Sequence, residues 1–221
     1  MPESILGIPL GIAIMWGAGA LYALGAILFF NSFRKEMKNE LMTALFAFLV
    51  SMALALLLMG TGEYSKNMIF GYLGTLSILI GSVFMLKFPL TMFPSVKKTL
   101  FRLVLAGVLL VFIWMVVSTF GRQTMPQFIM WYMIVVNGFV AGFFIFFVGF
   151  RSKEKAARIK ATGGGLGIAS CCIASHIASI AGALLVSAVF QFMAPLILIL
   201  SLLIGRYYQR QSEKSILPKS A

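Results

Sequence analysis

The sequence predicts an all-α integral membrane protein, a bundle of seven transmembrane helices, and three observations carry that prediction. Mean hydropathy is +1.00, and 61% of the 221 residues are hydrophobic. Only 11% are charged, against about 25% in ordinary soluble domains. Uncharged runs of about 20 residues, the length that crosses a bilayer, recur along the chain. Lipid is therefore the main solvent expected around these segments.

Each uncharged run gives one expected helix, and the longest run gives two. The first run follows Met1-Pro2-Glu3, which lacks the positive charge of a signal peptide, so an uncleaved first helix is predicted. The last run, 161–205, is long enough for two spans, with a turn expected at Gln191 and Pro195. The predicted helices are 5–31, 41–61, 68–87, 100–120, 127–150, 164–188 and 192–207.

The longest connection between these helices is the stretch 87–102. Pro89 and Pro94 should interrupt a helix there. Phe88 and Phe93 can enter lipid at the membrane interface, so this stretch is expected to lie along the membrane surface. Residues 1–207 are predicted to form one seven-helix transmembrane domain, and residues 208–221 a short basic cytoplasmic tail.

Lysine and arginine are distributed unevenly between the two ends of the expected helices. If the helices alternate in direction, 16 of the 18 fall on one side, and only Lys66 and Arg122 fall on the other. Cytoplasmic loops carry such an excess, so a multi-pass cell-membrane protein with its N-terminus outside and its C-terminus cytoplasmic is predicted. The net charge of +12 is spread over four short segments. The expected partners are therefore anionic lipid headgroups at the cytoplasmic face, most densely at 151–160, and not nucleic acid.

The first and fifth expected helices share a pattern at an offset of 117 residues. Pro9, Gly25, Phe29-Phe30 and Phe33-Arg34 correspond to Pro126, Gly142, Phe146-Phe147 and Phe150-Arg151. This correspondence predicts a parallel 3+1+3 repeat, an arrangement that transporters use. The seven-helix plan with an outside N-terminus also resembles the sugar-transporting SWEET and PQ-loop proteins. Their Pro-Gln pair is matched by Pro126-Gln127 alone, so the chain is not assigned to them.

Small residues recur every four positions in the sixth expected helix, at Gly163, Gly167, Cys171, Ser175 and Ser179. Such rows let helix backbones approach closely. Helix 164–188 is therefore predicted to be the most tightly packed helix of the bundle. Two shorter pairs, Gly7 with Gly11 and Gly138 with Gly142, are predicted to mark further helix contacts.

The chain lacks the residues that most membrane chemistry needs. It has no Asp, and its six Glu fall outside the expected helices. Carboxylates within the membrane are the usual groups of proton relays and cation pathways, so neither a proton pump nor a carboxylate-coupled exchanger is expected. Paired-carboxylate and Ser-His-Asp catalysis also lack their residues. The protein is therefore predicted not to be an enzyme.

One polar cluster in helix 164–188 has the residue types of a metal site: Cys171, Cys172 and His176. Cys172 and His176 are four residues apart and share a helix face, and Cys171 lies about 100° around the helix. His176 is expected near the bilayer centre, where an ionisable group is costly. Thiolate and imidazole suit soft or borderline ions such as Cu(I), Zn(II) or Hg(II). These three residues are the candidate metal ligands, and Cu(I) is the candidate ion.

The segment Gly163-Gly-Gly-Leu-Gly-Ile-Ala-Ser-Cys-Cys172 resembles the first helix of mercuric-ion transport proteins. The resemblance implies that Cys171 and Cys172 receive a metal ion from outside and pass it inward. It is local to this segment, since those proteins are shorter, have fewer helices and carry a second cysteine pair that is absent here.

Two functional hypotheses follow. In the first, the protein is a small transporter or a soft-metal-handling protein, and helix 164–188 lines the path. In the second, it is a non-catalytic accessory subunit of a membrane complex, or a sensor module, with other membrane subunits as partners. The cysteines are then small buried apolar residues. The two hypotheses differ in whether Cys172 and His176 face a cavity or a closely packed neighbour.

Overall fold

The computed structural model describes residues 4–5, 7–120, 138, 140–171 and 184–216, which are almost entirely α-helical. The predicted all-α class is confirmed. The long helices are α1 (Leu10–Phe33), α2 (Glu40–Ser65), α3 (Met68–Met85), α5 (Lys97–Phe120), α7 (Lys155–Ala169) and α9 (Leu184–Ile216), together with the helix Val140–Arg151. The short elements are a hairpin of β1 (Ser4–Ile5) and β2 (Ile8–Pro9), the 3-10 turn η1 (Arg34–Glu36), and α4 (Lys87–Leu90).

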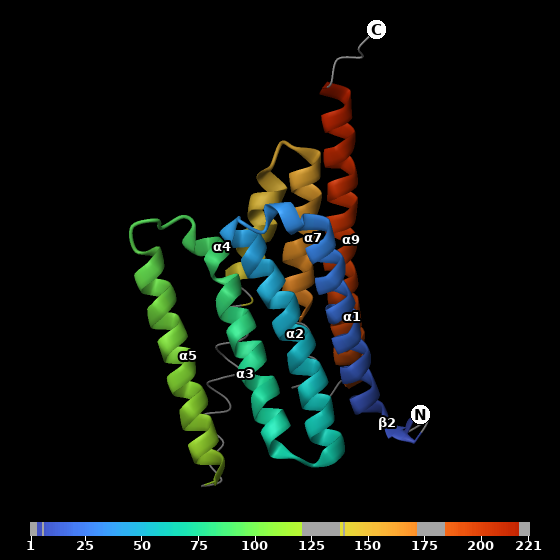
Figure 1. Ribbon diagram of the computed structural model, residues 1–221, viewed down its shortest axis with the longest axis vertical. Coiled ribbons are helices and arrows are strands. Elements are labelled where there is room, and N and C mark those ends of the chain that lie inside the picture. Colours follow the sequence, from blue (N-terminus) through green and yellow to red (C-terminus); the bar gives the residue numbers. More distant parts are fainter. Residues whose placement is uncertain (1–3, 6, 121–137, 139, 172–183, 217–221) are drawn as a thin grey trace.

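The helices run alternately up and down the bundle (Figure 1). Helix α2 packs between α1 and α3, α9 packs against both α1 and α7, and α5 lies at the edge beside α3. The α1–α2 connection, α4, the turn before α7 and the end of α9 all lie at one end of the molecule. The hairpin β1–β2 and the α2–α3 connection lie at the opposite end.

Asparagine side chains start α2 and α3. The Asn39 side-chain oxygen accepts a hydrogen bond from the Leu41 amide at 2.9 Å, and the Asn67 oxygen accepts one from the Ile69 amide at 3.0 Å. These bonds satisfy amide groups that have no partner within the helix. Lys66 ends α2 in the left-handed conformation, with φ of 54°. The left-handed Lys66 and the Asn67 cap together form the short turn between α2 and α3.

Four helices in the described part of the chain are long and apolar enough to cross a membrane: Leu10–Phe33, Glu40–Ser65, Met68–Leu90 and Val189–Ser212. Their composition fits an integral membrane protein. The helix Val140–Arg151 is apolar but shorter. The count of seven spans and the orientation stay predictions.

The turn predicted at Gln191 and Pro195 is wrong. Helix α9 begins at Leu184 and continues through Pro195, which lies inside it. A proline removes one helical hydrogen bond, but membrane helices tolerate it where neighbouring helices satisfy the released groups. Both Pro195 and the preceding Ala194 are buried, which places the proline on the packed side of the helix.

Two predicted helix ends, both at the end of the bundle that holds the α1–α2 connection (Figure 1), are also wrong. Helix α7 begins at Lys155 and not at residue 164, and α9 continues to Ile216, into the predicted tail. Lys155, Arg158 and Lys160 therefore belong to a helix and not to a loop. Long basic side chains can pack their apolar stems along a neighbour while the charge reaches water. The stem of Lys160 lies against Gly205 of α9, and its ammonium donates a hydrogen bond to Gln209.

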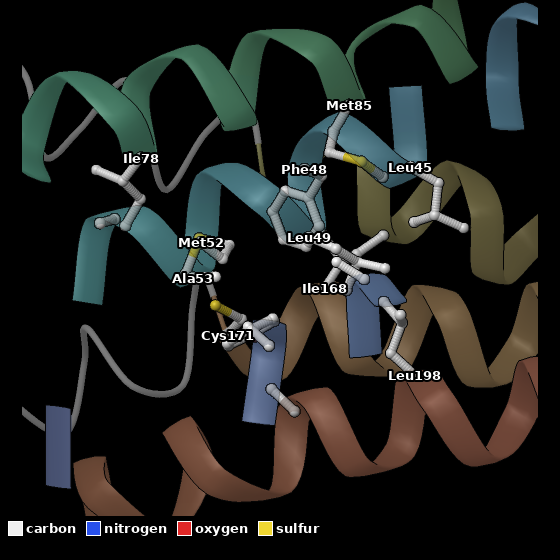
Figure 2. Close-up of a cluster of buried hydrophobic side chains, with 14 of the residues drawn as sticks. Leu45, Phe48, Leu49, Met52, Ala53, Ile78, Met85, Ile168, Cys171 and Leu198 are labelled. Atoms are coloured by element: carbon white, nitrogen blue, oxygen red, sulfur yellow. The ribbon is translucent and has the colours of Figure 1, made fainter. Parts of the chain in front are cut away.

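Buried side chains from α1, α2, α3, α7 and α9 form one continuous hydrophobic core. Phe48 and Leu49 of α2 occupy its centre, and Met85, Ile168 and Leu198 reach it from α3, α7 and α9 (Figure 2). Each of these five side chains is at most 2% exposed. The core thus joins the first three helices to the last two described helices.

Candidate functional site on helix α7

Cys171 is the part of the predicted metal site that the structure describes. It follows α7 directly, where Ser170 and Cys171 adopt π-helical geometry. Its side chain is 5% exposed. Cys172 and His176 lie outside the described residues, as do Ser175 and Ser179 of the small-residue row. The structure therefore tests the surroundings of Cys171 alone.

The prediction that helix 164–188 spans the membrane would place Cys171 near the middle of that span. The last charged residue of the helix is Lys160. Ten residues separate Ala161 from Cys171, a rise of about 15 Å at 1.5 Å per residue. The hydrocarbon core of a bilayer is about 30 Å thick. In the predicted span, the thiol of Cys171 is therefore far from either headgroup layer.

One face of α7 meets α9 with almost no space between the backbones. A Cβ atom at Gly167 would lie 3.0 Å from the carbonyl oxygen of Ala194 and 3.1 Å from Cβ of Leu198. At Gly163 it would overlap the side chain of Ser201. The predicted tight packing of the row is confirmed at these two glycines, and Cys171 continues the row as a buried side chain.

A second face of α7 meets the helix Val140–Arg151. A Cβ atom at Gly165 would lie 2.6 Å from the amide nitrogen of Phe146 and 2.7 Å from the carbonyl oxygen of Gly142. The predicted helix contact at Gly142 is thus present. The predicted contacts at Gly7 and Gly11 are not seen, because a Cβ atom at either glycine would meet no neighbouring group of the described chain within 4 Å. Gly7 instead occupies the β1–β2 turn with φ of 79°.

Cys171 belongs to a cluster of buried hydrophobic residues, and one member of that cluster carries a second sulfur atom. Cys171, Ile168, Met52 and Ala53 belong to the same buried cluster. Figure 2 shows the Cys171 side chain directed toward Met52 and Ala53 of α2. Thiol and thioether are both soft donors. Among the described residues, no group of three or more His, Cys, Asp or Glu side chains is close enough together to hold a metal ion.

Two polar side chains near this helix were not singled out from the sequence. Ser201 is 6% exposed and donates a hydrogen bond from its hydroxyl to the carbonyl oxygen of Leu198 at 2.9 Å. The hydroxyl oxygen of Thr162 is buried and has no hydrogen-bond partner in the described part of the protein. Neither position carries a sequence signal, because isolated Ser and Thr are common in membrane helices.

Basic side chains join α1, α7 and α9 at the end of the site predicted to be cytoplasmic. Lys160 donates a hydrogen bond to Gln209 at 2.5 Å. The charged groups of Lys160 and Arg206 lie 5.3 and 5.2 Å from the ring centre of Phe33. Lys155 lies 4.0 Å from the ring centre of Tyr208. These cations therefore interact with groups of the protein itself.

Comparison of the chain with protein-family models, with curated proteins and with solved structures finds no match. The geometry of the chain alone therefore carries the functional argument.

Proposed function

We propose that the protein is a non-catalytic integral membrane protein, an accessory subunit or sensor module of a larger membrane complex. It crosses the cell membrane seven times, with its N-terminus outside and its C-terminus in the cytoplasm. The observation that carries this proposal is the packing of α7. Its glycine faces are filled by α9 and by the helix Val140–Arg151, so α7 has the contacts of a structural helix.

The surroundings of Cys171 support the same proposal. A helix that lines a transport path needs polar groups or water along one face. Cys171 instead contributes to an apolar cluster with Ile168 and Met52. Cysteine commonly serves as a small buried residue in such clusters, and the burial of Cys171 is consistent with that role.

Metal analysis of cysteine variants tests this proposal. The double variant Cys171→Ala,Cys172→Ala should fold, reach the wild-type level in membranes and leave cellular copper tolerance unchanged. The purified wild-type protein should show no stoichiometric uptake of Cu(I). One equivalent of Cu(I) in the wild type, lost in the double variant, would overturn the structural role of α7.

Soft-metal handling is the second candidate function, and the sulfur of Met52 favours it. Thiolates of Cys171 and Cys172, the imidazole of His176 and this thioether would offer Cu(I) a soft donor set at mid-membrane depth. Cys172→Ser should then weaken Cu(I) binding strongly, because a hydroxyl is a poor ligand for a soft ion. Met52→Leu should weaken it further.

Met59→Leu is the matched control for the second candidate. Met59 lies on α2 as Met52 does, but it packs against Gly74 of α3. Leu and Met have similar volumes, so both substitutions should leave the fold intact. Equal Cu(I) affinity in the Met52 and Met59 variants would remove Met52 from the donor set.

A further inference from the structure

A small cavity lies where α2, α4 and α5 meet, at the end of the bundle that holds the α1–α2 connection (Figure 1). Its volume is about 110 Å³, and it is lined by Glu40, Lys87, Lys97, Lys98, Phe101 and Arg102. A water molecule occupies about 30 Å³ in the liquid. The cavity therefore has room for a compact group of several non-hydrogen atoms.

Positive charge dominates the lining of this cavity. Four of its six residues are basic, and Glu40 is the single acid. The Glu40 carboxylate accepts a hydrogen bond from Lys97 and lies 3.6 Å from the Lys87 ammonium. Within the described residues, Lys98 and Arg102 make no ion pair. Two cations of the lining are thus left for an anion from outside the chain.

The fold holds part of this lining in place before any anion arrives. The Lys87 ammonium lies 5.2 Å from the ring centres of both Phe84 and Phe101, and its side chain is 17% exposed. Cations are attracted to aromatic faces at this distance. Because these contacts already hold the Lys87 side chain in place, anion binding costs less conformational entropy at this residue.

The segment beside the cavity places it at the depth of lipid headgroups. Met92, Phe93 and Val96 are 66%, 56% and 43% exposed, although all three are apolar. They lie between α4 and α5, directly before Lys97 and Lys98. Apolar side chains next to lysines are typical of segments that lie in the membrane interface. A lipid can therefore reach the cavity with its headgroup while its acyl chains stay in the bilayer.

We infer that this cavity binds the phosphate group of an anionic phospholipid, with Lys98 and Arg102 as its main contacts. The planar guanidinium of Arg102 matches two phosphate oxygens, and the lysines add charge. The densest basic segment of the sequence, 151–160, is less suited, because Lys155 and Lys160 already interact with Tyr208 and Gln209. A free phosphate ion shares the chemistry, but the exposed apolar segment beside the cavity favours a lipid.

Lipid titration of the purified full-length protein tests the inference. Binding of short-chain phosphatidylglycerol is measured in detergent, with phosphatidylcholine as the neutral lipid. A Lys or Arg close to the bound headgroup contributes on the order of fivefold in affinity, and this attraction falls off with distance. Lys98→Gln,Arg102→Gln should therefore weaken phosphatidylglycerol binding by about twenty-fivefold. The control Lys35→Gln,Lys38→Gln removes the same charge from the α1–α2 connection and should change affinity less than about twofold.

Further controls compare other sources of the anion and provide a second variant in case the first one misfolds. Inorganic phosphate and glycerol phosphate should bind far more weakly than phosphatidylglycerol; equal affinity would overturn the lipid as ligand. Equal losses in the two double variants, or no saturable binding, would overturn the site itself. If Lys98→Gln,Arg102→Gln fails to fold, Arg102→Lys keeps the charge and should weaken binding severalfold through loss of the guanidinium fork. Unchanged affinity in that variant would also overturn the site.

Discussion

At the scale of single residues, three neighbouring glycines of α7 face three different surroundings. A Cβ atom at Gly165 would lie within 2.8 Å of Phe146 and Gly142, and at Gly167 within about 3 Å of Ala194. At Gly164 its nearest neighbour would be a methyl group of Ile145 at 3.9 Å, an ordinary contact. The four-residue spacing in the sequence identified Gly163 and Gly167. It did not identify Gly165, because that glycine faces a different helix.

We predict that alanine is tolerated at one of these glycines and not at the other two. Gly165→Ala and Gly167→Ala should each lower the free energy of unfolding by about 1–3 kcal/mol, because the new methyl group forces backbones apart. Gly164→Ala should be neutral or stabilise by up to about 1 kcal/mol, since alanine favours the helix. Thermal or denaturant unfolding in detergent measures all three. Equal effects at the three positions would mean that α7 does not pack as described.

At the scale of elements, local sequence rules failed where a neighbouring helix changed their outcome. Pro195 was expected to break a helix, yet α9 continues through it. The charged residues Lys155–Lys160 were expected in a loop, yet they form the first turns of α7. In both places α7 and α9 pack directly against each other. Gly167 of α7 approaches Ala194 beside Pro195, and Lys160 of α7 packs against Gly205 of α9. Such contacts cannot be read from a local pattern.

The continuity of α9 can be measured directly by the distance between two spin labels. Val189 and Gln211 are exposed and lie on either side of Pro195. An unbroken helix places their Cα atoms about 33 Å apart, at 1.5 Å per residue. Labels at Leu200 and Gln211, both beyond the proline, give a control distance of about 16 Å. A distance between Val189 and Gln211 well below 30 Å, with the control distance unchanged, would contradict a continuous α9 and support the predicted turn.

At the scale of the whole molecule, the basic connections gather at one end of an alternating bundle. The segments at 34–38, 87–102, 151–160 and 206–210 share that end, and the α2–α3 connection, which holds Lys66, lies at the other (Figure 1). This arrangement agrees with the charge count that predicted the orientation. The 3+1+3 repeat stays a prediction. The two glycines that it aligns make different contacts, since Gly25 meets Ile199 of α9 and Gly142 meets α7.

The orientation leads to a labelling experiment on the intact membrane. Single cysteines replacing Glu63 and Lys66, in a chain whose own cysteines are alanine, should react with an impermeant thiol reagent from outside. Cysteines replacing Lys38 and Lys153 should react only after the membrane is opened, because positively charged connections stay in the cytoplasm. All four positions are exposed. Labelling of residue 63 only after permeabilisation would reverse the orientation.

The sequence alone determined the all-α class, the apolar composition that fits a membrane, and the approximate positions of α1, α2, α3 and α5, because long uncharged runs require helices in lipid. It also found the glycine face of α7, since small residues at helical spacing allow close backbones. Only the tertiary structure decided that α9 is continuous, that α7 begins at Lys155, and that Met52 lies near Cys171. Only the tertiary structure brought Glu40 to Lys87 and Lys97. These contacts join residues far apart in the chain, and which surfaces meet depends on the shape of the whole bundle.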